Sequence, residues 1–228
     1  MATLLDYLTD TRFVLHDANA ITFTDAQLIR CINKARDSII SQILAPQVVT
    51  SFPLVSGQEA YGFATVILPA VQNAVSSLGA TARAVACVVG ANFVQTPNLK
   101  IPLEPITFTD ANERYRLNPI NSLPEAFTTL SAGDWLYVEP PPSGSGWTLE
   151  VRCVWLPTLM ATYTDVEQAI PNPFSDAVVP MEAARWAWSF NDDEDAADRF
   201  EQKAMREIAK ISSAMPLPWA SVPYSSIY

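Results

Sequence analysis

The side chains best suited to chemistry are few and widely separated along this chain of 228 residues. The single histidine, His16, stands beside Asp17, and such a pair could act as a general base. No nucleophile motif accompanies it, because Ser145 lies in Gly-Ser-Gly and lacks the five-residue pattern of a nucleophile elbow. The sequence therefore favours a structural role for His16, and we expect no catalytic residue.

Patterns that would hold a metal or a disulfide are missing as well. The cysteines Cys31, Cys87 and Cys153 are far apart, odd in number and form no C-x-x-C pair. Neither a zinc ribbon nor a disulfide framework is expected, and free thiols indicate folding in a reducing compartment. The acidic run 192–195 lacks EF-hand spacing and is interpreted as a solvated helix N-terminus. We expect no metal and no cofactor.

Carboxylates in the middle of the chain are the remaining candidates for catalytic residues. Asp134, Glu139 and Glu150 could hydrolyse a glycosidic bond only if two of them lay about 5–10 Å apart. Sequence cannot set that distance, and surface acids are the commoner outcome. We therefore expect that the protein is not an enzyme.

The net charge and the distribution of hydrophobic residues argue against nucleic-acid and membrane partners. The chain carries 14 Lys and Arg against 24 Asp and Glu, a net charge of -10, so specific binding of nucleic acid or of an anionic membrane is not expected. Asp6 and Asp10 interrupt the apolar start, so no secretory signal is predicted. Pro69 and Gly79 break the least charged stretch, so no membrane span is predicted either. The 49% of hydrophobic residues indicates a folded core.

Two helices are predicted at the N-terminal end. Residues 2–15 place Leu4, Leu5, Leu8 and Leu15 near one face. A second helix begins at Thr24, which forms a capping box with Gln27, and Phe23 and Leu28 can form a hydrophobic staple. Its apolar stripe follows Leu28, Ile32, Ala35, Ile39 and Ile43, is limited by Arg36, and should end near Ala45 and Pro46.

The middle of the chain is predicted to be β-rich. The expected strands are 48–53, 60–63, 81–90, 127–130, 135–139 and 147–155, with a short helix or long turn within 64–78. The last two strands flank a seven-residue loop rich in Pro, Gly and Ser and are interpreted as a hairpin. The hexapeptide ITFTDA occurs at 21–26 and again at 106–111, and both copies are interpreted as local helix starts, the second only one turn long.

Helical periodicity returns after residue 164. Ser175 or Asp176 is expected to cap a helix that runs to about Phe190, and a second helix is expected from Asp193 to Ser212. Trp186 and Trp188 lie on different faces of the first helix, which suggests that a neighbouring subunit helps to bury them, together with Phe200 of the second.

The C-terminal residues 215–228 form an uncharged stretch with several prolines and aromatic residues. Prolines exclude a helix, and disordered tails are usually charged and poor in aromatic residues, so we interpret the stretch as an extended docking tail. The alternative is that it folds back on its own domain. The predicted contact residues are Pro216, Leu217, Trp219, Tyr224, Ile227 and Tyr228.

These elements predict an α+β fold in which a β-rich domain, sandwich-like or barrel-like, is inserted into a helical bundle. The expected parts are N-terminal helices at 1–46, the β-rich domain at 47–163, C-terminal helices at 164–213 and the extended tail at 214–228.

The ordered series of motifs resembles the head-to-tail adaptor, or connector, proteins of tailed bacteriophages. The resemblance rests on residues 23–29 and 32–35 in the second helix, 137–142 and 154–157 around the last two strands, and 169–171, 174–177 and 183–187 before and within the C-terminal helices. It implies a homo-oligomeric ring of about twelve copies, bound below the portal protein in the virion neck and assembled in the host cytoplasm. The ring would join the portal to a tail nozzle or tube protein, the tail would reach the portal, and DNA would pass through without specific binding.

Three other interpretations stay open at this point. Trp135, Trp147 and Trp155 could form a carbohydrate platform in a phage receptor-binding module. A cell-wall hydrolase would need a catalytic group that the sequence does not supply. A tail-completion or neck protein of different stoichiometry would differ from an adaptor only in its place in the virion.

Overall fold

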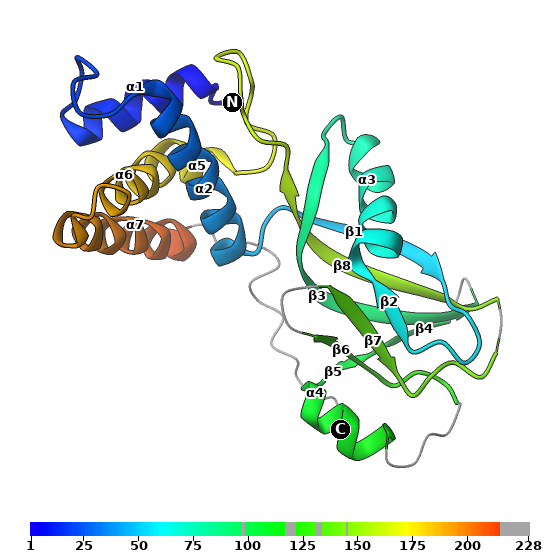
Figure 1. The fold of residues 1–228 in the computed structure, drawn as a ribbon. Helices are drawn as coiled ribbons and strands as arrows, with labels where there is room; N and C mark the ends of the chain where they lie inside the picture. The colour runs from blue at the N-terminus through cyan, green and yellow to red at the C-terminus, as the bar shows by residue number, and fades with distance from the viewer. Residues whose placement is uncertain (97–98, 117–121, 131–133, 145, 215–228) are drawn as a thin grey trace. The chain divides into compact units, whose positions relative to one another are not determined.

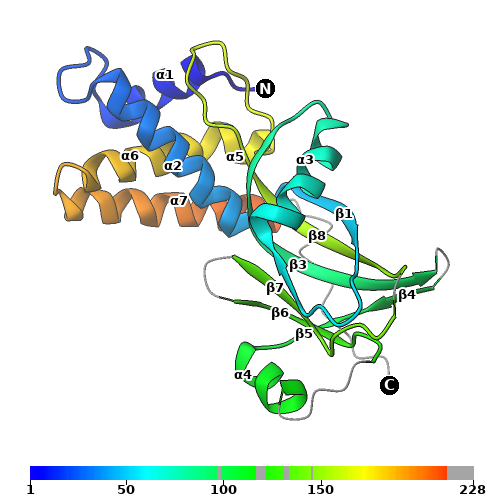
Figure 2. The same ribbon diagram turned by 45° about the vertical axis from the view of Figure 1, so that its right-hand side comes forward.

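The computed structural model describes residues 1–96, 99–116, 122–130, 134–144 and 146–214, and the chain divides into two compact units. The first unit combines Met1–Ile43 with Leu159–Tyr228, and the second is Leu44–Thr158. Helices dominate the first unit and two sheets dominate the second (Figures 1 and 2), so the predicted α+β class is confirmed. The predicted docking tail lies outside the described residues.

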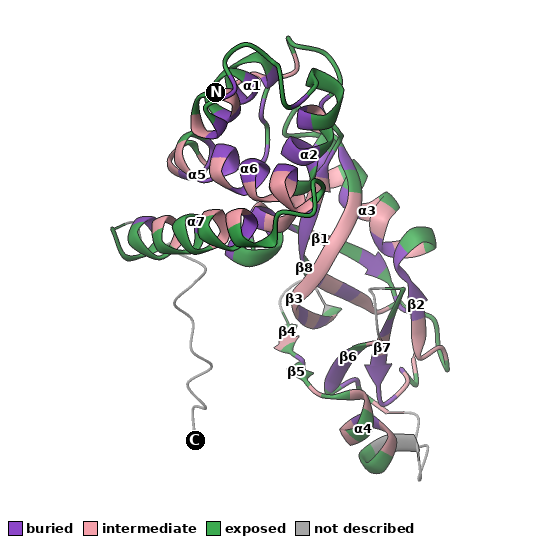
Figure 3. Cartoon of the chain, turned by 60° about the vertical axis from the view of Figure 1, so that its left-hand side comes forward, coloured by how far each residue is buried: buried purple, intermediate pink, exposed green. Residues whose placement is uncertain are grey.

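The helical unit is built around one central helix. Its helices are α1 Leu4–Leu15, α2 Asp25–Ile43, α5 Asn172–Ala177, α6 Val179–Ser189 and α7 Glu194–Ala214. Helix α6 packs against α1, α2, α5 and α7, so its small residues Ala183, Ala184 and Ala187 are buried. Helix α7 buries only Ala197, Ala204 and Ile211, and Figure 3 shows most of its remaining surface exposed or half-buried.

The start of α2 follows the capping signals in the sequence. The Gln27 N–H donates to Thr24 Oγ1 at 3.3 Å, and the Thr24 N–H donates to Gln27 Oε1 at 2.9 Å, which confirms the capping box. The whole predicted apolar stripe of α2 is buried. Two expectations for the neighbouring residues are wrong. Leu5 of α1 is 53% exposed, and Arg36 lies within the buried face of α2 because a buried carboxylate pairs with it.

The predicted cap at Ser175 or Asp176 is also wrong. Helix α5 already begins at Asn172, with Pro171 before it and Pro173 in its first turn, where a missing N–H costs no helical bond. Ser175 is therefore buried inside α5, and its hydroxyl donates to the Asn172 carbonyl at 3.1 Å.

The described residues of the β-rich unit form two four-stranded sheets. The first has the order β1 (Gln47–Pro53), β8 (Thr148–Pro157), β3 (Ala82–Thr96) and β4 (Leu99–Pro102). The second has the order β2 (Ala60–Gly62), β7 (Trp135–Glu139), β6 (Ala126–Leu130) and β5 (Glu104–Pro105). The π-helix η1 (Phe63–Ile67) leads into α3 (Leu68–Ser76), which packs on β1 and β3. Of the short helix or long turn predicted within 64–78, the helix is what forms.

The hairpin predicted from residues 135–139 and 147–155 does not form. Both strands exist, but β7 pairs with β2 and β6, whereas β8 pairs with β1 and β3 in the other sheet. The loop therefore crosses between sheets. The reason is that the distant β1 and β3 occupy both edges of β8, so β8 is a central strand with Leu149, Val151 and Cys153 buried.

The repeated hexapeptide starts a helix at both places, but at different residues. In the second copy, Thr107 caps α4 (Phe108–Ala111) by accepting from the Asp110 N–H at 3.1 Å. Helix α4 continues directly into the π-helix η2 (Asn112–Arg116), so the prediction of a single turn is wrong. In the first copy the residue equivalent to Thr107 is Thr22, and the cap is Thr24 instead. Asp25, the residue equivalent to Asp110, accepts instead from Arg12 and Tyr163, and Gln27 completes the capping box at Thr24.

Candidate interaction surfaces

The residues predicted for tail docking cannot be placed, because Pro216, Leu217, Trp219, Tyr224, Ile227 and Tyr228 lie outside the described residues. The predicted packing residues can be placed, and all three are half-buried. Trp188 contacts Phe23 edge to face, with ring centroids 5.3 Å apart. Trp186 faces elsewhere and contacts Phe190 at 5.8 Å, and Phe200 of α7 lies 4.9 Å from the Lys203 ammonium. The structure thus brings no two of the three predicted packing residues into ring contact.

Trp186 is instead the centre of a row of aromatic and cationic side chains along α2 and α6. The Arg185 guanidinium lies 4.3 Å from its ring and the Lys34 ammonium lies 5.2 Å from it. One helical turn away, Arg30 lies 5.9 Å from the ring of Phe190, which is 50% exposed. Exposed contacts of this type contribute about 0.5–1 kcal/mol each. We call these five residues, Arg30, Lys34, Arg185, Trp186 and Phe190, the aromatic–cation row.

Sequence reasoning found only Trp186 of this row. The spacing of four residues between Arg30 and Lys34, and between Trp186 and Phe190, was a usable signal, because residues four apart share a helix face. The pairing of the two helices was not visible in the sequence. The Trp186 Nε1 hydrogen is buried and meets no acceptor within the described part of the chain, which is unusual for a tryptophan.

A pocket of about 220 Å³ lies beside the row. Its lining consists of Phe23, Gln27, Arg30, Cys31, Ala187, Phe190 and Asn191, from the start of α2 and the end of α6. Burial raises the pKa of the Cys31 thiol to about 11, so the thiol stays protonated and is a poor nucleophile. The pocket can receive an apolar side chain, but it holds no activated catalytic group.

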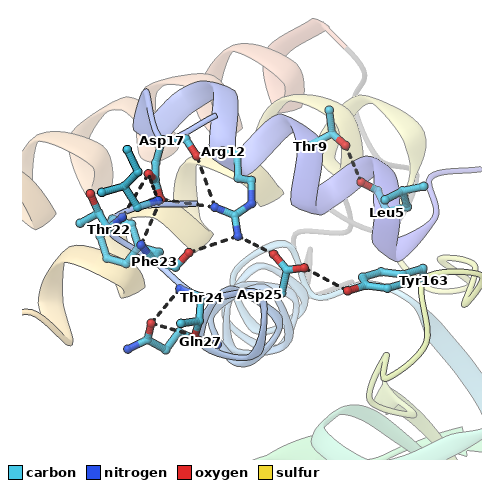
Figure 4. Close-up of polar contacts among 11 residues, drawn as sticks. Leu5, Thr9, Arg12, Asp17, Thr22, Phe23, Thr24, Asp25, Gln27 and Tyr163 are labelled. Carbon is cyan, nitrogen blue, oxygen red and sulfur yellow. Dashed lines mark hydrogen bonds and ion pairs between the residues drawn. The ribbon is translucent and has the colours of Figure 1, made fainter. Parts of the chain in front are cut away.

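Two polar clusters hold the helical unit together. Figure 4 shows Arg12 donating to the Asp17 carbonyl at 3.3 Å, to the Phe23 carbonyl at 3.1 Å and to the Asp25 carboxylate, which also accepts from Tyr163 at 3.0 Å. Asp17 accepts from three consecutive backbone N–H groups, those of residues 21–23 (Figure 4). Burial opposes the charge of Asp17, but these donors and Arg12 hold its pKa below the ordinary value. The cluster fixes the turn that leads into α2.

The second cluster is buried and centres on Glu167. Its carboxylate accepts from Arg36 Nε at 2.7 Å, from Arg36 Nη2 at 3.2 Å and from the Tyr7 hydroxyl at 3.1 Å. The backbone N–H groups of residues 168–170 donate to the same carboxylate. Asn33 exchanges two hydrogen bonds of 2.9 Å with the backbone of Met160. These contacts attach the segment before α5 to α1 and α2, and no residue among them is free to react.

The residues considered for catalysis do not come together. His16 is exposed and ends α1 in a left-handed conformation with φ 55°. Glu139 is buried on β7, whereas Glu150 on β8 belongs to the other sheet and pairs with Lys100 and Asn92. In the acidic run, Asp193 accepts from the Ala196 N–H and so caps α7. Among the described residues no group of three potential metal ligands is found.

The tryptophans considered for sugar binding are also separated. Trp155 is buried at 3% exposure, and Trp147 packs edge to face on Phe93 with centroids 5.0 Å apart. Trp135 is 45% exposed but lies on β7, in the other sheet. Two of the three rings therefore serve the core, and the described residues offer no shared aromatic platform. None of the described helices is both long and apolar enough to cross a bilayer.

Comparison with known proteins identifies the family of the chain. The family model of the SU10 adaptor protein matches residues 2–221. A search of curated proteins found no match. The matched family consists of structural phage proteins and not of enzymes, and its members are virion components that associate with other virion proteins. Because the match spans nearly the whole sequence, this chain belongs to the SU10 adaptor protein family.

Proposed function

We propose that about twelve copies of this chain form a ring below the portal protein of a tailed phage and join the portal to a tail nozzle or tube protein. The observation that carries the proposal is the adaptor-family match over residues 2–221. The ring lies in the neck of the virion, is assembled in the host cytoplasm, and surrounds the channel through which DNA leaves the capsid. Counting the subunits distinguishes it from a neck protein of different stoichiometry.

The charge of the chain supports a DNA channel in preference to a DNA-binding surface. Each copy carries a net charge of -10, so a ring of about twelve copies carries about -120. Binding to phosphates requires clustered Lys and Arg, and the like charges here repel the duplex. DNA therefore passes through the ring without being held.

Subunit packing uses the half-buried aromatic residues of the helical unit. Trp186, Trp188 and Phe200 each keep part of their surface accessible in one copy, and a neighbouring copy completes their burial. Trp186 is the strongest of the three, because its ring already orders Arg185 and Lys34 and its buried Nε1 hydrogen has no described acceptor. Contact with a neighbour that shifts this ring slightly would give the hydrogen a partner.

Attachment to the portal uses the C-terminal tail. The segment 215–228 is uncharged and contains Leu217, Trp219, Tyr224 and Ile227, which suit apolar pockets on a partner. One tail per subunit makes the contact multivalent, so even weak single contacts give a joint that dissociates very slowly.

The proposal is tested by deleting residues 216–228 and measuring co-sedimentation with purified portal particles. The matched control is Ser225→Ala with Ser226→Ala, which keeps every aromatic and aliphatic side chain of the tail. We expect the deletion to keep the circular dichroism spectrum and thermal midpoint but to abolish portal binding, whereas the control binds normally. Unchanged portal binding by the deletion variant refutes tail docking, and a native mass that stays monomeric with and without portal refutes the ring.

A further inference from the structure

Among the described residues, none pairs with the outer edge of β1 in the first sheet. In an antiparallel pair, residues alternate between directing both backbone groups at the partner strand and directing both away from it. The Leu54 N–H donates to the Trp147 carbonyl at 2.8 Å, and the Trp155 N–H donates to the Pro46 carbonyl at 3.3 Å. The register between these bonds is regular, so the even-numbered residues of β1 direct their backbone N–H and C=O groups at β8. Gln47, Val49 and Ser51 therefore direct their N–H and C=O groups outward.

The opposite edge of the same sheet is open over part of β3. The odd-numbered residues of β8 direct their backbone groups at β1, so the even-numbered residues of β8 direct theirs at β3. The β3 residues opposite the odd positions direct their backbone groups away from β8, and between Ala82 and Phe93 these are Val85, Val88 and Ala91. The Ala91 carbonyl confirms the direction, because it accepts from the Leu103 N–H at 2.9 Å on the side away from β8.

Own-chain partners cover this edge only at its ends. Strand β4 pairs with β3 from Asn92 onward, and Gln72 Nε2 donates to the Ala82 carbonyl at 3.1 Å. Between these points, no described residue bonds to the outward groups of Val85 or Val88. Figures 1 and 2 show β4 beside only one end of β3, and Figure 3 shows β3 half-buried along most of its length.

The open stretch keeps the spacing of a regular strand despite three irregularities. The register between β3 and β8 shifts between Ala82 and Ala84, between Val85 and Cys87, and between Val88 and Gly90. Each shift adds one residue to β3, so the outward residues recur every three positions on β3 but every two on β8. A partner strand thus meets backbone groups at the ordinary interval of about 6.6–6.8 Å. Bulges also twist an edge, which limits pairing with unsuited strands.

Neither edge carries any of the charge that would keep copies apart. The β3 stretch reads Ala-Val-Ala-Cys-Val-Val-Gly at 84–90, and β1 reads Gln-Val-Val-Thr-Ser-Phe-Pro at 47–53. Each is seven residues long without an ionisable group other than the Cys87 thiol, whose pKa burial raises. In a chain with a net charge of -10, these two edges are therefore places where two copies can meet without like-charge contact.

We propose that β1 of one copy pairs with the open stretch 84–90 of β3 in the next copy, so that the first sheet continues from subunit to subunit. Within one copy, β1 and β3 are both antiparallel to β8 and hence parallel to each other. A neighbour in the same orientation therefore presents β1 parallel to β3. This contact joins two different edges, and repeated head-to-tail contacts of this kind close into a ring. The inference rests on the ring formation proposed above.

The test removes one outward N–H from each edge. Val49→Pro acts on β1, and Val88→Pro acts on β3, and neither residue donates to β8 in the pairing derived above. The matched controls Val49→Thr and Val88→Thr keep the N–H and the β-branched shape. Ser51→Pro and Val85→Pro serve as second variants at the neighbouring outward positions. Native mass is measured by light scattering at rising concentration, alone and on portal particles.

We expect wild type and both Thr variants to form the ring, and each Pro variant alone to remain monomeric. A 1:1 mixture of Val49→Pro and Val88→Pro then forms a heterodimer and stops, because each variant keeps the edge that the other has lost. The heterodimer also shows that both variants are folded. If both Pro variants form the wild-type ring, the edge pairing is wrong while the ring stands. If only the β3 variants fail, the partner of β3 is another strand, such as the tail or a second β3. A wild type that never assembles overturns both proposals.

Discussion

Removal of the Glu167 charge should destabilise the helical unit strongly. The carboxylate accepts six hydrogen bonds, two from Arg36, one from Tyr7 and three from backbone N–H groups, and the Arg36 side chain that it neutralises is 3% exposed. In Glu167→Gln one carboxylate oxygen becomes an NH₂ group, which turns a donor toward existing donors. The buried guanidinium then loses the carboxylate that accepts two of its hydrogen bonds, a change that costs about 3–5 kcal/mol. Since a domain is stabilised by about 5–15 kcal/mol, this is a large fraction of the total.

The assay is urea unfolding followed by far-ultraviolet circular dichroism, with tryptophan fluorescence as a second probe that shows whether the two units unfold together. The control is Glu207→Gln in α7, where the carboxylate pairs with the exposed Lys210 at 2.9 Å. This pair is open to solvent, so its loss should change the free energy of unfolding by less than about 1 kcal/mol. If Glu167→Gln costs no more than Glu207→Gln, the buried cluster does not stabilise the fold and the reasoning is wrong.

Three further predictions concern pH, capping and thiols. Burial opposes the charge of Glu167, but Arg36 holds the pKa of Glu167 below the ordinary value of 4.5. The stabilisation of the fold by the Glu167 charge is therefore present above about pH 4.5 and is lost as pH falls through the lowered pKa. Glu167→Gln should flatten the acid limb of a plot of unfolding free energy against pH. Thr24→Ala removes the cap of α2 and should lower the free energy of unfolding in urea by about 1 kcal/mol, and no change would contradict the capping role. Cys31 and Cys153, with pKa values raised by burial to about 11 and about 12, should resist a disulfide reagent at pH 8 until urea unfolds the chain, and rapid labelling would contradict their burial.

Prediction from the sequence succeeded for elements whose structure is set by residues close together in the chain. The start of α2 depends on Thr24 and Gln27, three residues apart, and its buried face repeats with the helical period. Both signals act within one or two turns, so they survive whatever the rest of the chain does. The predicted strands also appear, because β-branched and aromatic runs between turns depend on local composition.

Sequence reasoning failed where a distant segment competes for the same partner. Trp135–Glu139 and Thr148–Pro157 are adjacent in sequence and separated by a loop of turn residues, which favours a hairpin. The longer β3 and the seven-residue β1 pair with β8 instead, and both come from earlier in the chain. Pairing energy summed over many residues outweighs the short loop, and no local pattern reports it.

Arg36 is an intermediate case, because the sequence indicates that it needs a buried counter-charge but does not identify that partner. It lies four residues after Ile32 and three before Ile39, so helical geometry places it next to the apolar stripe. A charge at such a place requires a buried counter-charge, which was a usable signal. Its partner Glu167 stands 131 residues away, and only the fold identifies it.

The candidate surfaces of this adaptor were hidden from motif analysis for a related reason. Association needs no reactive side chain, so the informative features are groups that the fold leaves unsatisfied. The aromatic–cation row depends on the packing of α2 against α6, and the open edge of β3 depends on the alternation set by β8 and on where β4 ends. Val85 and Val88 look like ordinary strand residues in the sequence, because a free backbone group leaves no trace in side-chain chemistry. For a protein that works by assembly, the sites are therefore found by asking which hydrogen bonds one copy cannot complete alone.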